Sequence, residues 1–306
     1  MTHVAPCGHQ ELADAIVGFV ARKSGVDVPR LRDLVESTIA DAGDNAVAGL
    51  QARLAKSADA WAYYGRDPLA HRLHHELARV VLKDAPVVIG AGRLDALRHG
   101  PAIIVANHLS YSDANVIEVL LHQCGYPDIA NRLAVIAGPK VYSDLGRRFS
   151  SLCFGTIRSP QNEQVSSGEA AMSARDVACA AKQTLAAARA RLNDGDVLLL
   201  FPEGTRSRSG RIQSFLPGVA RYFENDADLI LPIGLCGTEQ MFGIGEDRLG
   251  AATISMTVGE PFTAGAVRAR SGDDRRRFVD LLAAAVAAQL PPQYRDANPG
   301  RETELL

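Results

Sequence analysis

The stretch Val197-Leu-Leu-Leu-Phe201-Pro-Glu-Gly-Thr-Arg206 joins a continuous apolar run to a polar, glycine-containing turn. An unbroken apolar run of this kind is typical of a strand buried on both faces of a parallel sheet. In open α/β sheets, ligands bind beside the loops that follow the carboxyl ends of such strands. The stretch therefore predicts an α/β fold with a binding site in the turn after Phe201.

The turn itself has the chemistry of an anion site. Gly204 allows the backbone to approach a ligand closely, and the guanidinium groups of Arg206 and Arg208 can each fork onto phosphate oxygens. The hydroxyl group of Thr205 adds a further donor. A solvated basic loop is the alternative, but an acid, a glycine and an arginine directly after a buried strand favour the phosphate site.

A second stretch, Pro101-Ala-Ile-Ile-Val-Ala-Asn-His108-Leu-Ser-Tyr-Ser-Asp113, delivers a histidine and then an aspartate into a turn. Histidine exchanges protons near neutral pH, and a nearby carboxylate can hold its tautomer and stabilise the imidazolium. On a straight helix, residues five apart diverge by about 140°. His108 and Asp113 therefore meet only if residues 109–112 bend the chain. The alternative is a helix capped at Ser112 or Asp113 beside an idle histidine.

These residues resemble the motifs of the glycerolipid acyltransferases, the family of glycerol-3-phosphate and 1-acylglycerol-3-phosphate acyltransferases. Asn107–Asp113 matches the first motif, NHxxxxD, and Phe201–Ser207 matches the third, FPEGTRS, letter for letter. Gly155–Arg158 resembles the second motif and Leu229–Ile233 the fourth, and all four follow the order of the family. The resemblance covers about residues 86–262, and its first and third motifs are highly specific.

The resemblance implies transfer of a fatty acyl group from an acyl thioester, on coenzyme A or acyl carrier protein, to a hydroxyl group of a lysophospholipid. The preferred acceptor is 1-acylglycerol-3-phosphate. His108 is then the general base, and Asp113 orients it. The residues assigned to substrate binding are Lys140, Arg158, Glu203, Gly204, Thr205, Arg206 and Arg208. No metal is expected, and no cofactor other than the acyl donor as co-substrate.

The resemblance also suggests separate roles within this set. Arg158 and Arg206 are expected to hold the acceptor phosphate, with the other two basic residues as weaker candidates. Glu203 either accepts a hydrogen bond from an acceptor hydroxyl group or braces the turn. The developing oxyanion needs donors, and backbone N–H groups near Gly204 or in the turn after His108 are the candidates.

Other acceptors and other activities stay open. Glycerol-3-phosphate is an alternative, because a helical N-terminal segment without a membrane span resembles the plastid-type glycerol-3-phosphate acyltransferases. Against this, the FPEGTRS spelling resembles the lysophosphatidic acid enzymes more, which favours a lysophospholipid acceptor. A lyso-ornithine lipid is a further alternative. In a thioesterase, water would replace the acceptor, and Arg158 and Arg206 would have no evident purpose. A non-catalytic lipid-binding protein would be expected to lack His108 or Asp113.

The hydrophobic pattern divides the chain into three parts. Residues 1–85 show helical spacing of apolar side chains throughout and predict a small N-terminal helical bundle. Residues 86–290 alternate strands and helices, which predicts a mixed, largely parallel sheet flanked by helices. Within them, residues 159–173 are expected to form a mobile loop beside the active site. Residues 291–306 are polar and are expected to form a disordered tail.

Two groups in the predicted bundle have a second interpretation. His71, His74 and His75 share part of one helix, and the i, i+4 pair could ligate zinc. No acidic residue lies at a suitable spacing, so a solvated helix face is expected instead. The aromatic segment 61–64 is expected to pack in the core rather than to anchor the protein at a membrane interface.

Composition and charge narrow the class of protein. The chain of 306 residues has a formal net charge of −2, which argues against a dedicated nucleic-acid binder. Residues 132–221 are basic, with 13 Lys and Arg against 7 Asp and Glu, and would attract an anionic substrate or lipid surface. The five cysteines form no CxxC pair, so no disulfide framework or zinc site is expected. Without a signal peptide or an apolar run of about 18 residues, we expect a cytoplasmic protein, peripheral at the inner face of the membrane.

Overall fold

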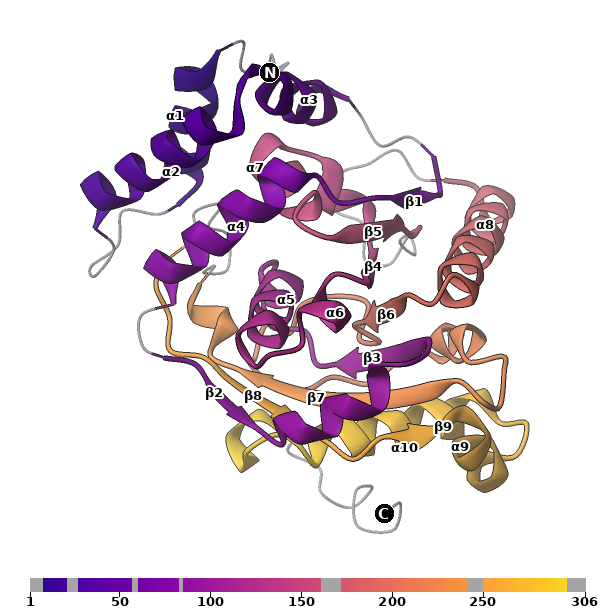
Figure 1. Ribbon diagram of the computed structural model, residues 1–306. Helices are drawn as coiled ribbons and strands as arrows, with labels where there is room; N and C mark the ends of the chain where they lie inside the picture. The colour runs from indigo at the N-terminus through magenta and orange to yellow at the C-terminus, as the bar shows by residue number, and fades with distance from the viewer. Residues whose placement is uncertain are drawn as a thin grey trace.

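A central mixed sheet with helices on both faces forms the frame of the protein (Figure 1). This computed structural model describes residues 8–20, 27–56, 60–82, 85–160, 172–241 and 250–295. It confirms the predicted mixed, largely parallel sheet flanked by helices. Most of the predicted loop at 159–173 lies outside the described residues. Among the described residues, no helix has the length and apolar character needed to cross a membrane.

The strands form one sheet in the order β1-β5-β4-β6-β3-β7-β8-β2, and β9 pairs with β7. From β5 to β7 in this order all pairings are parallel, whereas β1, β8 and β9 join by antiparallel pairing and β2 runs parallel to β8. The strands are β1 (Tyr63–Tyr64), β2 (Val87–Ile89), β3 (Ala102–Ala106), β4 (Leu133–Ala137), β5 (Gly155–Arg158), β6 (Val197–Leu200), β7 (Leu229–Cys236), β8 (Ser255–Val258) and β9 (Phe262–Thr263).

Alternate residues of the central strands pack into two different cores. In β3, Ala102 and Ile104 belong to one buried cluster and Ile103 and Val105 to the other, as the period of two in a strand requires. The first cluster packs against the helices of the N-terminal bundle and against α5 (Asp113–Gln123), α6 (Pro127–Ala130) and α7 (Leu145–Ser151). The second cluster packs against α8 (Ala174–Asn193), α9 (Ala264–Ser271) and α10 (Arg275–Ala287). The continuous apolar runs in the sequence reflect this burial on both faces.

Pro232 explains how the fourth motif fits inside a central strand. A proline cannot donate to a ladder of hydrogen bonds. On one edge of β7, residues 229–230 pair with β9 and residues 233–236 pair with β8, so Pro232 lies where the partner strand changes. Its carbonyl oxygen still accepts from the backbone N–H of Gly259 (2.8 Å). The missing N–H group therefore falls at a natural break in the pairing.

The N-terminal helices pack together, as predicted (Figure 1). They are α1 (His9–Phe19), α2 (Val28–Ala42), α3 (Asp44–Ala55) and α4 (Pro68–Val81). The start of α4 is fixed by its sequence, because the Asp67 side chain accepts from two backbone N–H groups and Pro68 occupies the first turn. Leu12 and Leu73 share one buried cluster with Leu121 of α5. The predicted division of the chain at residue 85 stays a prediction.

The expectation that residues 1–85 are entirely helical is wrong at one point. Tyr63 and Tyr64 form β1, which pairs with β5 so that Tyr63 lies opposite Ile157. Tyr63 is half-buried against the second core cluster, and Trp61 packs under the guanidinium of Arg158, 4.4 Å from its ring centre. A strand of two residues is too short to produce an alternating pattern, so the helical pattern around it concealed it.

The three histidines of α4 do not form a solvated face. His74 is buried, and His71 and His75 are half-buried. All three lie within 4 Å of the Glu118 carboxylate of α5. The acidic partner that the local spacing lacked comes from a helix more than 40 residues further along the chain, where local periodicity carries no information.

The start of the predicted disordered tail is ordered. Pro292–Tyr294 forms a short 3-10 helix, and the carbonyl oxygen of Tyr294 accepts from the backbone N–H of Ile212 (2.8 Å). The Tyr294 hydroxyl group donates to Glu239 Oε1 (2.7 Å) and accepts from the N–H of Gly237 (3.1 Å). A single aromatic residue gives no periodic signal, so its docking could not be predicted. The tail beyond residue 295 lies outside the described residues.

Candidate active site

The loops that carry the first and third motifs meet at the carboxyl ends of β3 and β6. These strands are parallel neighbours, with Val105 opposite Leu200. The backbone N–H of His108 donates to Glu203 Oε1 (2.8 Å), and the N–H of Ser207 donates to the carbonyl oxygen of His108 (2.8 Å). The sheet therefore brings together two loops whose key residues are 95 positions apart.

His108 and Asp113 are directly hydrogen-bonded. The distance from His108 Nδ1 to Asp113 Oδ2 is 2.8 Å, and the same oxygen accepts from the backbone N–H groups of Leu109 (2.6 Å) and Ser110 (2.9 Å). These bonds bend the chain into the turn that the spacing of five requires, and α5 begins at the fully buried Asp113. Because a carboxylate only accepts, His108 Nδ1 carries the proton and Nε2 is left as an acceptor.

The His108 ring is half-buried and lines a cleft of about 1270 Å³. It stacks on Phe201, with ring centres 4.5 Å apart and an angle of 24° between the planes. The preceding Asn107 is buried and joins β3 to β7, because its amide group donates to the carbonyl oxygen of Leu235 (2.9 Å) and accepts from its N–H (2.8 Å). These contacts fix the position and the plane of the imidazole ring.

Glu203 is buried and both of its oxygens are engaged with the protein. Oε1 accepts from His108, and Oε2 accepts from the backbone N–H (3.0 Å) and the side-chain amide (3.1 Å) of Gln213. Burial raises the pKa of Glu203 to about 7, although the hydrogen bonds from His108 and Gln213 oppose this shift. Of the two expectations for Glu203, this geometry favours bracing of the turn over contact with a substrate.

Six of the predicted site residues line the same cleft. They are His108, Lys140, Gly204, Thr205, Arg206 and Arg208. Gly204 has φ +70°, a left-handed conformation that glycine adopts without strain, and an added Cβ would collide with Leu216. The cleft is therefore lined by a glycine-containing turn and by three basic side chains, those of Lys140, Arg206 and Arg208.

The structure adds two residues that sequence reasoning missed. The Tyr111 ring lies 3.7 Å from the Arg206 guanidinium carbon and 4.5 Å from that of Arg147. Tyr111 occupies a variable position of the first motif, and Arg147 lies in α7, which the pattern did not predict. Stacking on an aromatic face orients a guanidinium while its N–H groups stay directed outward.

Arg158 lies apart from this group. It ends β5, and its guanidinium stacks on Trp61. Among the described residues, those that line the cleft include its neighbours Thr156 and Ser159 but not Arg158. The structure therefore does not bring Arg158 and Arg206 to one wall, and a role for Arg158 in phosphate binding stays a prediction.

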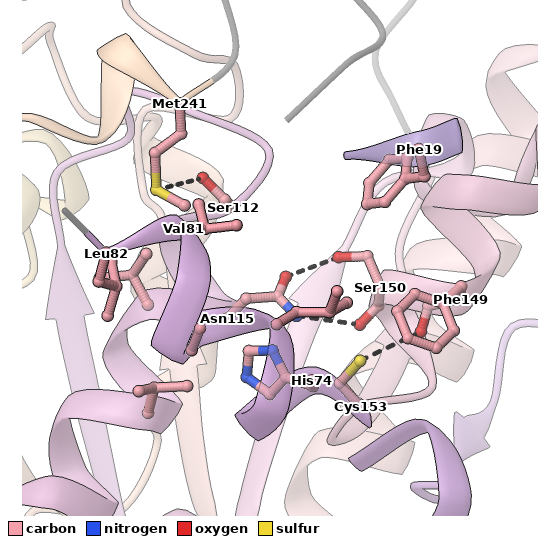
Figure 2. Close-up of a pocket in the computed structure, with 14 residues that line it drawn as sticks. Phe19, His74, Val81, Leu82, Ser112, Asn115, Phe149, Ser150, Cys153 and Met241 are labelled. Carbon is pink, nitrogen blue, oxygen red and sulfur yellow. Dashed lines mark hydrogen bonds between the residues drawn. The ribbon is translucent and has the colours of Figure 1, made fainter. Parts of the chain in front are cut away.

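A second, apolar pocket of about 50 Å³ lies next to the catalytic turn (Figure 2). Its walls come from α4, α5 and α7, and Ser112 and Asn115 connect it to the turn that holds Asp113. Figure 2 shows hydrogen bonds between residues of these walls: Ser112 donates to Met241, and Asn115 and Ser150 bond to each other. No motif pointed to this pocket, because its walls come from five separate segments of the chain.

Three comparisons bear on identity. No curated protein gives a significant sequence match. The crystal structure of the 1-acyl-sn-glycerophosphate (LPA) acyltransferase PlsC from Thermotoga maritima is similar, with a TM-score of 0.47 and 18% identity, over 86% of this chain and 98% of that chain. The sequence model of the acyltransferase family matches residues 88–235, which run from β2 through β7 and contain all four motif segments. The part of the chain that holds the central strands and the candidate active site therefore matches the acyltransferase family of enzymes.

Proposed function

We propose that this acyltransferase moves a fatty acyl group from an acyl thioester, on coenzyme A or acyl carrier protein, to a hydroxyl group of 1-acylglycerol-3-phosphate. The observation that carries the proposal is the 2.8 Å hydrogen bond between His108 and Asp113 in a cleft that Arg206 also lines. The same cleft therefore holds a histidine able to take a proton and an arginine able to bind phosphate.

In the proposed reaction, His108 Nε2 removes the proton of the acceptor hydroxyl group as its oxygen attacks the thioester carbonyl carbon. The buried Asp113 carboxylate stabilises the imidazolium that forms. The carbon–sulfur bond of the tetrahedral intermediate then breaks, and the imidazolium returns the proton to the leaving thiolate. The products are an ester and a free thiol, and no covalent enzyme intermediate is required.

The structure narrows the candidates for oxyanion donors. The N–H groups of Leu109 and Ser110 are bound to Asp113, and that of Gly204 donates to the carbonyl oxygen of Phe201 (3.0 Å). We therefore propose the next N–H groups of the turn, those of Thr205 and Arg206, because both residues line the cleft with His108. Preorganised backbone donors of this kind are a common means of stabilising tetrahedral intermediates.

For the acceptor phosphate, we propose Arg206 as the main ligand, with Arg208 and Lys140 as further cations. Stacking on Tyr111 holds the Arg206 guanidinium in place. The exposed apolar side chain of Leu216 also lines the cleft, which suits an acceptor that carries an acyl chain. We accordingly propose that the protein works at the cytoplasmic surface of a membrane.

The test is an assay of the purified protein with acyl-CoA and acyl carrier protein donors, with products identified by mass spectrometry. The acceptors are 1-acylglycerol-3-phosphate, glycerol-3-phosphate, a lyso-ornithine lipid and none. We expect the highest kcat/KM with 1-acylglycerol-3-phosphate and a loss of roughly 10²- to 10⁴-fold in His108→Ala. If another acceptor is used preferentially, the proposed acceptor is wrong. If the protein only hydrolyses the thioester, the proposed acyl transfer is wrong.

A further inference from the structure

Five side chains with metal-binding chemistry gather between α4 and α5. We call them the histidine cluster: His71, His74 and His75 of α4, and Glu118 and His122 of α5. His71 and His75 are one helical turn apart and so lie on one face of α4, and Glu118 and His122 have the same spacing on α5. None of the five lines the cleft of the candidate active site.

Glu118 is the centre of the histidine cluster and is fully buried. His75 Nε2 lies 3.2 Å from Oε1 and 3.1 Å from Oε2, and His71 Nδ1 lies 3.7 Å from Oε1. Burial alone would raise the pKa of Glu118, but the hydrogen bonds from His74 and His75 lower it to about 2. A carboxylate at a fully buried position therefore faces three imidazole nitrogens.

We propose that His71, His75 and Glu118 form a zinc site. Their ligand atoms lie within 4.8 Å of one another. Zinc bonds of about 2.0 to 2.2 Å in a tetrahedron place neighbouring ligand atoms about 3.3 Å apart, and the separations of 3.1 to 3.7 Å from the Glu118 oxygens bracket this value. Two imidazole nitrogens and a carboxylate oxygen are a donor set that zinc accepts.

The surroundings of the three ligands support them. His74 Nε2 donates to Glu118 Oε2 (3.0 Å) and so fixes the carboxylate, which is the usual arrangement around a metal ligand. His71 Nδ1 now donates to the carbonyl oxygen of Cys153 (3.0 Å), and a zinc ion at this nitrogen would take the place of that proton. The exposed His122, whose ring centre is 4.7 Å from that of His75, offers a fourth ligand on the solvent side.

A zinc ion here would join the N-terminal bundle to α5. α4 belongs to the bundle, and α5 begins at Asp113. Because binding to the folded state alone stabilises that state, zinc should raise the melting temperature of the chain. This inference does not depend on which acceptor the enzyme uses.

The experiment uses the full chain after treatment with a chelator and its removal. Zinc chloride alone is titrated into the protein by calorimetry, and melting temperatures are recorded at increasing zinc concentration. We expect one zinc ion per chain and a rising melting temperature. His75→Gln and His71→Gln should each weaken zinc affinity by on the order of 10²-fold, since each removes one of the few protein ligands.

Two controls locate the ion. His99→Gln changes an exposed histidine outside the histidine cluster and should leave zinc affinity unchanged, as should His108→Ala in the cleft. A third variant, Glu118→Gln, removes the buried carboxylate. If it does not fold, His75→Gln still decides whether the histidine cluster binds zinc, because His75 is only half-buried. The proposal is overturned by the absence of stoichiometric zinc binding, by normal affinity in His75→Gln, or by loss of binding in His108→Ala. In the first case, the histidine cluster is only a hydrogen-bonded network around a buried acid.

Discussion

At the scale of single residues, two buried carboxyl groups hold the backbone of the catalytic turn. Asp113 accepts from the ring of His108 and from two N–H groups beyond it, and Glu203 accepts from the N–H of His108 itself. The motifs identified both acids from the sequence. They could not assign Glu203 to the protein rather than to a substrate, because that depends on how the loops after β3 and β6 face each other.

The variant Asp113→Asn tests the proposed role of this carboxylate. Its amide oxygen can still accept from the Leu109 and Ser110 N–H groups, so the turn should fold. An amide cannot stabilise an imidazolium and can select the wrong tautomer of His108. We expect kcat to fall by roughly 10²- to 10⁴-fold with little change in melting temperature. A variant that kept more than about a third of the wild-type kcat would show that His108 works without Asp113.

Arg206→Lys tests the proposed phosphate contact. An ammonium group keeps the charge but cannot reproduce the forked hydrogen bonds or the stacking on Tyr111. We expect kcat/KM for 1-acylglycerol-3-phosphate to fall by roughly 10- to 150-fold through a higher acceptor KM, with the donor KM almost unchanged.

An unphosphorylated monoacylglycerol acceptor is the control for Arg206. Wild type should use it poorly, and the substitution should cause little further loss. Arg158→Ala, at a residue that stacks on Trp61, measures whether that arginine shares the phosphate. Equal losses in Arg206→Lys with both acceptors would mean that Arg206 serves the fold instead.

At the scale of elements, the sequence predicted those whose pattern is long or whose residues are buried on both faces. β3, β6, α5 and α10 belong to this group. It did not predict β1, which is two residues long, or α7, whose seven residues include only a few apolar side chains. Arg147 and one wall of the apolar pocket come from α7. Part of the site was therefore missed because the helix that carries it was not predicted.

The packing of α4 on α5 makes stability depend on pH through Glu118. Its pKa is lowered to about 2 from 4.5 in the folded protein. Its contribution is therefore present above about pH 4.5 and is lost as the pH falls toward 2. We compare the unfolding free energy at pH 5 and pH 3 in the presence of a chelator. It should fall by on the order of 2 kcal/mol more in wild type than in Glu118→Gln. Parallel losses in urea unfolding would contradict the lowered pKa.

At the scale of the whole molecule, burial and strand–helix alternation predicted the architecture, but contacts between distant segments could not be predicted. The histidines of α4 were assigned to solvent because their acid lies on α5. Tyr294 was assigned to a disordered tail because its partners, Gly237 and Glu239, follow β7. In each case the deciding contact joins segments whose separation along the chain leaves no local pattern.

Tyr294→Phe tests whether the docked C-terminal segment stabilises the folded protein. The substitution keeps the ring but leaves the N–H of Gly237 without its acceptor and Glu239 without a donor. Because a lost bond to a charged group and an unsatisfied N–H group each carry a cost, the unfolding free energy should fall by roughly 1 to 3 kcal/mol. The exposed neighbour Gln293 gives the matched control. Gln293→Ala should change the unfolding free energy by less than about 0.5 kcal/mol. Urea unfolding followed by circular dichroism measures both, and equal stability of the two variants would mean that the tail only rests on the surface.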